Sequence, residues 1–399
     1  MLKIIFRSIS RNTYYYLVLV MLFFYELCMF LSEVDVFAHK YVIMKLTKPV
    51  LFSMLLFLGM YIYINYRYIR FISFRRFWKL WLIVTCVVCL PIHLMVNDVN
   101  SGIEYIIQYV RLFLLPFLLY YFFSLVYIQK GIRKEEVAWP YFIFWCVIAF
   151  LYYSNIGNII VLREGNNGLY AVNYVYYMLM LLPSIFMLKI KICIVPIIIS
   201  AIAIMLSSKR GGILVLVFMC CSHLVVNIFY SRKGKARAKT VLMLLLLILM
   251  SILLSNIFNT SIENITSRFR DLKSDGGSGR IEIYTSVIKA YLSNNMSGLL
   301  FGNGVESTKL VTKGLTAHND LLEILYDYGL VSFIVILLLY KNILSKLVTL
   351  YKKNSELTYA FSASVMLFVI LTNISHVIVY PHFLILVPFF AFVFNYKLY

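Results

Sequence analysis

The feature that most constrains this chain is a repeated run of apolar residues, each about as long as a membrane is thick. A helix needs roughly 20 apolar residues to cross the hydrocarbon core of a bilayer. Runs of this length recur along the 399 residues, which are 62% hydrophobic and only 14% charged, against about 25% charged in soluble domains. The short alternating segments of a transmembrane β-barrel are absent from the sequence. These patterns predict an all-α polytopic integral membrane protein.

The apolar runs predict about twelve transmembrane helices in a single polytopic domain, 1–399. Their approximate limits are 13–32, 49–66, 78–96, 103–128, 138–157, 169–188, 192–207, 211–230, 240–258, 320–340, 357–375 and 381–396. The first run lacks a small-residue cleavage site, so we expect a retained span rather than a signal peptide. One long polar loop, 259–319, is predicted between the ninth and tenth helices.

Membrane topology explains the net charge of +20 better than nucleic-acid binding does. With the N-terminus inside, the cytoplasmic segments carry basic clusters such as 67–79 and 232–239, and very few acidic residues. This asymmetry follows the rule that positive residues stay on the cytoplasmic side. It places both termini in the cytoplasm and the 259–319 loop on the outer face. The 232–239 cluster also suits contact with anionic membrane lipid.

The seven cysteines all fall inside predicted spans, where a free cysteine behaves as a small hydrophobic residue. Cys86 and Cys89 have a spacing seen in metal sites, but no polar partner lies near them in the sequence. Neither a disulfide framework nor a metal site is indicated, and no cofactor is predicted.

The polar loop and its flanks carry four short motifs. They are Ser-Ser-Lys-Arg-Gly-Gly at 207–212, Gly-Arg-Ile-Glu-Ile-Tyr at 279–284, Leu-Leu-Phe-Gly-Asn-Gly at 299–304, and His-Asn at 318–319 followed by Glu323 and Gly329. A polar loop of this length between membrane spans is usually functional or disordered. The internal pattern favours a functional loop.

In order and rough spacing, these motifs resemble the signature of the O-antigen polymerase and O-antigen ligase superfamily, over roughly residues 163–332. The resemblance implies a bacterial enzyme of the cytoplasmic (inner) membrane that transfers a glycan from an undecaprenyl-diphosphate carrier at the outer face. It also implies inversion at the anomeric carbon, with arginines and a histidine in place of a metal ion.

Arg210 is the first candidate catalytic residue. The 207–212 connection is so short that its two helices must form a tight hairpin, and Gly211 and Gly212 permit close approach of the backbone. Exposed N–H groups and a planar guanidinium suit a phosphate group. Ser208, Gly211 and Gly212 are therefore candidate diphosphate-binding residues. The alternative is an arginine that only anchors the turn among lipid headgroups.

Arg280 and His318 are the other candidate catalytic residues. Arg280 opens a predicted amphipathic helix that would lie on the membrane surface. The apolar face of that helix would consist largely of Ile281, Ile283, Val287, Ile288 and Leu292. His318 stands at the start of the tenth helix, and imidazole suits a general base because it titrates near neutral pH. Asn319 and Glu323 follow as candidate substrate-binding residues. A histidine at a membrane surface is otherwise ordinarily structural.

Three further residues are candidates for binding the substrate. Arg111 lies near the middle of the fourth predicted helix, where a charge costs about 2.5–3.5 kcal/mol on insertion scales, so it should face a partner or a wet cavity. An ion pair between helices and a substrate role are both open. Arg163 and Asn173 lie in and just after the next outer loop, where the superfamily often has polar residues. A solvated loop arginine is the alternative there.

Together these features predict a glycosyltransferase that polymerises undecaprenyl-diphosphate-linked repeat units into O-antigen or capsular polysaccharide. Arginines would stabilise the leaving diphosphate, and His318 would accept the proton of the attacking sugar hydroxyl. An O-antigen ligase acting on lipid A core is the main alternative. A flippase is less favoured because few charges lie inside the spans. A chain-length regulator and a flippase of the same pathway are expected partners, and nucleic acid is not.

Overall fold

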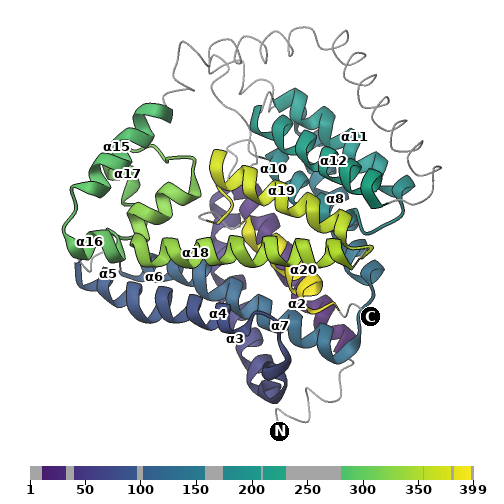
Figure 1. Cartoon of the computed structure of the whole chain (residues 1–399), viewed down its shortest axis with the longest axis horizontal. Coiled ribbons are helices and arrows are strands. Elements are labelled where there is room, and N and C mark those ends of the chain that lie inside the picture. Colours follow the sequence, from purple (N-terminus) through teal and green to yellow (C-terminus); the bar gives the residue numbers. More distant parts are fainter. Residues whose placement is uncertain are drawn as a thin grey trace. The chain divides into compact units, whose positions relative to one another are not determined.

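The structure is a computed structural model that describes residues 11–32, 40–96, 102–157, 174–207, 210–230, 280–353, 355–378 and 382–396. Across these ranges the regular secondary structure is helical, without a β-strand (Figure 1). The predicted all-α class is therefore confirmed. All seven cysteines are free thiols, as expected for a chain without a disulfide framework.

Eleven apolar helical segments lie within the described ranges, and each falls on a predicted span. Seven of them are long and apolar enough to cross a membrane: Thr13–Leu31, Lys45–Ile64, Arg75–Met95, Tyr105–Gln129, Lys134–Ser154, Ile190–Ser207 and Asp320–Lys352. The shorter four are Val175–Ile185, Gly211–Ser222, Thr358–Ile374 and Phe383–Asn395. The remaining predicted span, 240–258, lies outside the described residues. This pattern is that of a polytopic membrane protein.

Chain contacts divide the protein into two compact units. Unit 1 comprises Met1–Val137, Arg280–Lys346 and Thr372–Tyr399, and unit 2 comprises Ala138–Gly279 and Leu347–Leu371. The single domain predicted over 1–399 stays a prediction. The helices of unit 1 are α2 (Arg11–Ser32), α3 (Lys40–Ile64), η1 (Tyr66–Phe71), α4 (Arg75–Leu82), η2 (Ile83–Cys89), α5 (Leu90–Val96), α6 (Gly102–Tyr109), η4 (Val110–Leu114), α7 (Leu115–Lys130), α15 (Arg280–Leu292), α16 (Met296–Phe301), α17 (Thr308–Val311), most of α18 (Asp320–Lys352) and α20 (Phe383–Asn395).

The core of unit 1 is built around α7 and α20. Every residue of α20 from Phe383 to Phe394 is buried, as expected for a helix that is apolar on all sides. Two hydrogen bonds tie it to α7: Tyr127 donates to the Pro388 carbonyl at 3.2 Å, and Asn395 Nδ2 donates to Ser124 Oγ at 2.8 Å. This core holds α7 in place, and α7 continues directly from η4, which carries part of the site described below.

The long helix α18 is interrupted at Gly329, whose φ of 77° and ψ of 176° are not helical. Its backbone crosses that of Gly302 at contact. A Cβ on Gly329 would lie 2.4 Å from the Leu300 carbonyl oxygen, and a Cβ on Gly302 would lie 2.3 Å from the Asp327 carbonyl oxygen. Only glycine fits both the positive φ and the close approach. Two motif glycines therefore lock the polar loop onto the first turns of α18.

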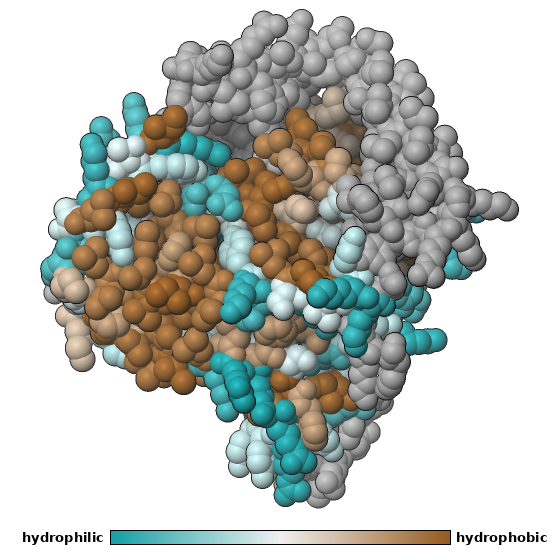
Figure 2. All heavy atoms as spheres, viewed as in Figure 1, coloured by the Kyte–Doolittle hydropathy of each residue, from teal (hydrophilic) through white to brown (hydrophobic). Residues whose placement is uncertain are grey.

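Beyond this kink, α18 presents apolar side chains on one face. Leu330, Ile334, Leu337 and Leu344 are between 39% and 48% exposed and recur at helical spacing. Figure 2 shows apolar side chains around the left part of this helix in the view. This exposure suits contact with lipid. The helix extends to Lys352, further than the 340 predicted.

The described part of unit 2 consists of helices. It contains most of α8 (Lys134–Ser154), together with α10 (Tyr174–Ile185), α11 (Ile190–Ser207), α12 (Arg210–Tyr230) and most of α19 (Thr358–Ile374). The Tyr152 hydroxyl of α8 donates to the Ala203 carbonyl of α11 at 3.0 Å. A Cβ on Gly212 would lie 3.3 Å from Ile204, so α11 and α12 meet closely at the motif turn, as the glycine pair predicted.

Candidate functional site

A small polar cavity of about 60 Å³ lies in unit 1, between the α6–η4 helix and the segment that runs from residue 305 into α18. Arg111 and Lys309 contribute basic side chains to its wall, and Glu306, Glu323 and Asp327 contribute carboxyl groups. This combination suits a ligand with both anionic and hydroxyl groups, because arginine binds oxyanions and carboxylates accept hydrogen bonds from hydroxyls.

Arg111 reaches this cavity from η4, which is a π-helical turn. Such turns are rare and occur frequently at functional sites. Its guanidinium is close enough to Tyr25 for a side-chain hydrogen bond, while its Nε has no hydrogen-bond partner among the described residues. An unsatisfied buried donor in a cavity wall supports the substrate-binding interpretation of Arg111. The ion-pair interpretation involved Glu104, whose side chain lies outside those that the structure describes.

Two carboxylates of α18 attach the polar loop to the helix. Asp327 Oδ1 accepts hydrogen bonds from the Thr308 backbone N–H at 2.7 Å and from the Thr308 hydroxyl at 2.6 Å. Glu323 Oε1 accepts one from the Ala317 N–H at 2.6 Å. Both side chains are almost fully buried. Glu323 therefore anchors the loop as well as lining the cavity, and Asp327, one turn further on, is a site residue that the motif comparison did not include.

His318 follows Ala317 and has a positive φ of 52°. This left-handed conformation is uncommon for a residue with a Cβ and costs energy, and such strain clusters at functional sites. The His318 Nε2 lies 3.5 Å from Thr316 Oγ1, and Thr316 itself lines the cavity. His318 is thus held beside the cavity, at the entrance to a membrane helix.

Asn319 has a structural task at this position. Its Oδ1 accepts hydrogen bonds from the backbone N–H groups of Leu321 and Leu322, at 3.0 and 3.1 Å, which makes it the N-cap of α18. Its Nδ2 donates to the Asn373 carbonyl at 3.3 Å. The predicted role of Asn319 in binding the substrate stays a prediction.

His376 flanks the last outer loop in the sequence and is only a weak candidate there, yet the structure places it beside His318. The centroids of the two imidazole rings are 5.0 Å apart. His376 Nδ1 also lies 3.6 Å from Asp320 Oδ1 and 3.5 Å from Glu323 Oε2. Nothing in the sequence pattern pointed to this pairing, because His376 comes after the next helix, α19.

His382 belongs to the same neighbourhood. Burial, together with the nearby charges of His376 and Arg111, lowers the pKa of His382 to about 3. A charged imidazole would lose its hydration there and would meet other positive groups. His382 is therefore neutral at physiological pH.

The turn that begins at Gly302 is held by His93, which also bonds to Tyr109. His93 of α5 donates from Nε2 to the Phe301 carbonyl at 2.7 Å. This tautomer leaves Nδ1 as the acceptor for the Tyr109 hydroxyl. His93 is almost fully buried, so it acts as a fixed strut between α5, α6 and the polar loop.

Arg280 begins α15, whose inner face packs beside His318. Val287 of that face forms an apolar cluster with Ala317 and Tyr326, and Ile283 packs against it. Arg280 lies three residues before Ile283 and seven residues before Val287, which places it on the same face of α15. The helix carries Arg280 about 10 Å from Val287 along its axis.

The predicted single apolar face of α15 is wrong. Val287 is 1% exposed, whereas Ile281, Ile288 and Leu292 are 64%, 44% and 71% exposed. The helix therefore has two apolar faces, one packed against the polar loop and one exposed. Sequence periodicity merged them because the two faces adjoin on the helix surface.

Several sequence candidates are not brought into this site by the structure. Arg210, Gly211 and Gly212 begin α12 in unit 2, and the Arg210 side chain is not among those described. Ser208, Arg163 and Asn173 lie outside the described residues. Convergence of Arg210 with Arg280 and His318 therefore stays a prediction. Within the described ranges, no group of three or more histidine, cysteine or acidic residues could hold a metal ion.

Comparison with known protein families bears on the same segment. A family model described as O-Antigen ligase matches residues 195–337, which is less than half of the chain. The match contains the 207–212 turn, α15, the Gly302 crossing and His318. A search of curated proteins finds no match. Residues 195–337 are thus similar to the O-antigen ligase family, consistent with the O-antigen polymerase and ligase superfamily that the four motifs indicated.

Proposed function

We propose that this protein is a glycosyltransferase that polymerises undecaprenyl-diphosphate-linked oligosaccharides at the outer face of the bacterial cytoplasmic membrane. The observation that carries the proposal is the position of His318. It is strained, half-buried and adjacent to a polar cavity that Arg111 lines, two residues before a membrane-length helix. The match of this segment to the O-antigen ligase family supports the same reaction class.

In the proposed reaction His318 is the general base. The acceptor sugar hydroxyl gives its proton to His318 while its oxygen bonds to the anomeric carbon of the donor. The bond from that carbon to the diphosphate breaks, and the electron pair leaves with the lipid-linked diphosphate. Attack opposite the leaving group inverts the anomeric carbon. Both substrates are confined to one membrane surface, which supplies much of the proximity that the transfer needs.

Arginines supply the electrostatic part of this mechanism. A guanidinium stays charged at any working pH and binds phosphate oxygens in a bidentate way, so it can stabilise the charge that develops on the diphosphate. We assign Arg210, Arg280 and Arg111 to this role, with the Ser208–Gly212 turn as a phosphate cradle and with Arg163 and Asn173 at its rim. No metal ion takes part in this proposal.

Glu323 and Asp327 are proposed to orient the acceptor sugar. Their carboxylates line the cavity, and carboxylates accept hydrogen bonds from sugar hydroxyls. The cavity volume of about 60 Å³ holds part of one sugar ring rather than a whole oligosaccharide. Only the reacting end of the acceptor would then enter it.

A ligase that transfers finished glycan to lipid A core is the second candidate, because the matching family model is described as O-Antigen ligase. The sequence from Ala317 to Gly329 resembles a polymerase more closely, which is why polymerisation is proposed first. A flippase of the same lipid-linked sugar comes third.

A deletion strain separates these candidates. Loss of a polymerase should leave surface glycan that carries a single repeat unit, because export and attachment continue. Loss of a ligase should leave a bare acceptor while long polymer collects on the lipid carrier. Loss of a flippase should trap single repeats on the cytoplasmic side. A full polysaccharide ladder on a gel of the deletion strain would rule out the proposed polymerase.

A further inference from the structure

His376, which the transfer step above does not use, lies at the centre of a cluster of ionisable side chains. Its Nδ1 faces two carboxylate oxygens, Asp320 Oδ1 at 3.6 Å and Glu323 Oε2 at 3.5 Å. All three side chains are at least 90% buried. Carboxylate oxygens at this range favour the protonated form of an imidazole.

Both carboxylates are held in place by backbone groups. Asp320 Oδ2 accepts hydrogen bonds from the N–H groups of Val377 and Ile378, at 2.7 and 2.8 Å. Glu323 Oε1 accepts one from Ala317. Each carboxylate thus binds the backbone with one oxygen and turns the other towards His376. The position of His376 is therefore determined by the fold and not by the packing of one flexible side chain.

His318 is the neighbour on which a charged His376 acts. The ring centroids are 5.0 Å apart and the planes are tilted by 41°. A positive charge at this distance disfavours a second positive charge on His318. A histidine that stays neutral is the form that can accept a proton.

The other ionisable groups around His376 reinforce this arrangement. Among the described residues they include Asp320 and Glu323 of α18 and His382 just before α20, and Arg111 of η4 lies near His382. Burial lowers the pKa of His382 to about 3, so it adds no charge. Arg111 adds a permanent positive charge near His382 and so favours neutrality of the histidines on its side.

We propose that His376 is a positioning residue that acts through His318. Held as an imidazolium between Asp320 and Glu323, it fixes the His318 ring and keeps it neutral, ready to take the proton of the acceptor hydroxyl. After the transfer, the proton on His318 leaves readily to water because His376 is charged beside it. This inference rests on the proposed function, since it assigns a role within the same site.

Chemical modification of His318 tests the proposal without measuring transfer. Diethyl pyrocarbonate reacts with neutral imidazole, so the pH dependence of its reaction rate, read at His318 by peptide mass spectrometry, reports the fraction of neutral His318. The experiment uses the purified full-length protein in lipid nanodiscs. His376→Gln removes the neighbouring charge, and the midpoint of the His318 profile should then rise by about one pH unit or more, as expected for the loss of a charge this close. An unchanged midpoint overturns the proposal.

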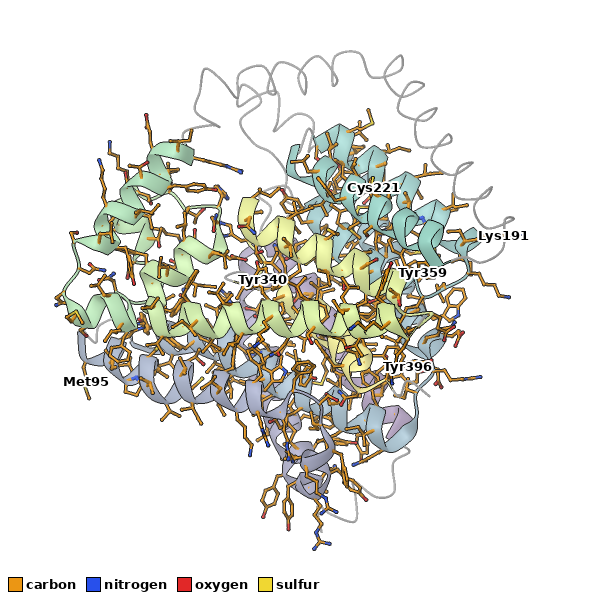
Figure 3. All side chains as sticks on the ribbon, viewed as in Figure 1. Met95, Lys191, Cys221, Tyr340, Tyr359 and Tyr396 are labelled. Atoms are coloured by element: carbon orange, nitrogen blue, oxygen red, sulfur yellow. The ribbon has the colours of Figure 1, made fainter. Side chains whose placement is uncertain are left out.

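Two further variants keep the result interpretable. Tyr340→Phe removes a buried hydroxyl that bonds to Thr372, on α18 and the end of α19 (Tyr340 is labelled in Figure 3), and should leave the midpoint unchanged. His376→Lys restores a cation and should keep the midpoint near that of the wild type. If His376→Gln does not fold, the Lys variant decides: a raised midpoint there contradicts the role of charge.

The readout also separates this inference from the proposed function. A shifted midpoint in a protein that transfers no glycan would support the role of His376 and contradict the proposed polymerase function. Normal transfer with an unshifted midpoint would do the opposite.

Discussion

Two regions of unit 1 are buried to a similar extent, but one buries apolar side chains and the other buries acidic ones. The helix α20 buries only apolar side chains and proline between Phe383 and Phe394. The first turns of α18 instead bury Asp320, Glu323 and Asp327, which are 0%, 3% and 2% exposed. Apolar burial stabilises a fold directly, whereas burial of a carboxylate is costly unless hydrogen bonds and opposite charges compensate.

From this difference we infer that α20 maintains the fold, and we propose that the start of α18 carries out the chemistry. The start of α18 has buried charges, a positive φ at His318 and a backbone crossing that only glycine permits. Features of this kind lower stability and persist where function needs them. Substitutions in α20 should therefore change stability, and substitutions around His318 should change activity.

The largest expected effect on stability is in the apolar core. Phe389 is fully buried in α20, and Phe389→Ala should reduce the free energy of unfolding by about 3–5 kcal/mol through lost burial and a residual cavity. Phe52→Ala is the matched control, because Phe52 is 54% exposed. Denaturant unfolding of the purified protein in mixed micelles measures both. Activity per folded molecule should be unchanged. A selective loss of activity in Phe389→Ala would contradict the claim that α20 contributes to stability alone.

The next effect is at the backbone crossing. Gly329→Ala introduces a Cβ at a φ of +77°, 2.4 Å from the Leu300 carbonyl oxygen, and should cost about 3 kcal/mol through strain and displacement of the loop. Gly59→Ala in α3 is the control, since nothing lies within 4 Å of that Cβ. Here transfer activity should fall together with stability. A stable and active Gly329→Ala protein would show that the crossing does not position the site.

The smallest of the three stability effects depends on pH. The pKa of His382 is about 3 in the folded protein and ordinarily about 6.5 when unfolded. Between these values the unfolded chain binds a proton that the folded chain does not, so stability falls as pH drops below 6.5, by about 2 kcal/mol at pH 5. Above pH 6.5 the contribution is fully present and constant.

His382→Asn should remove this part of the pH dependence. The measurement is the difference in unfolding free energy between pH 7.5 and pH 5, compared for the variant and the wild type. Equal differences in the two proteins would mean that His382 is not buried as a neutral group.

Hydropathy was sufficient to predict the membrane class and the positions of the apolar helices, because the requirement for about 20 apolar residues leaves few alternatives. It did not locate the kink in α18 or the π-helical turn at Arg111. Both depend on contacts between segments distant in sequence, such as Gly302 against Gly329. The motif glycines were visible in the sequence. The backbone crossing that requires glycine at both positions was not.

The candidate site was only partly predictable for the same reason. His318, Glu323 and Arg111 were found from motif and membrane depth. The helical spacing of Asp327 to Glu323 already placed it near His318. The pairing of His376 with His318 could not be predicted, because a whole helix separates the two residues in the chain, and only the fold brings the two imidazoles together.

The proposed polymerase depends on His318 as the base for glycosyl transfer. The most direct test is the initial rate at which purified protein in proteoliposomes extends a synthetic undecaprenyl-diphosphate-linked repeat. His318→Ala should lower this rate by about 100-fold or more, the usual contribution of a general base. Ser293→Ala, which removes an exposed hydroxyl bonded only locally to the Ala290 carbonyl, should stay within about twofold of the wild type, as surface substitutions usually do. A His318→Ala protein with a near-normal rate would contradict the claim.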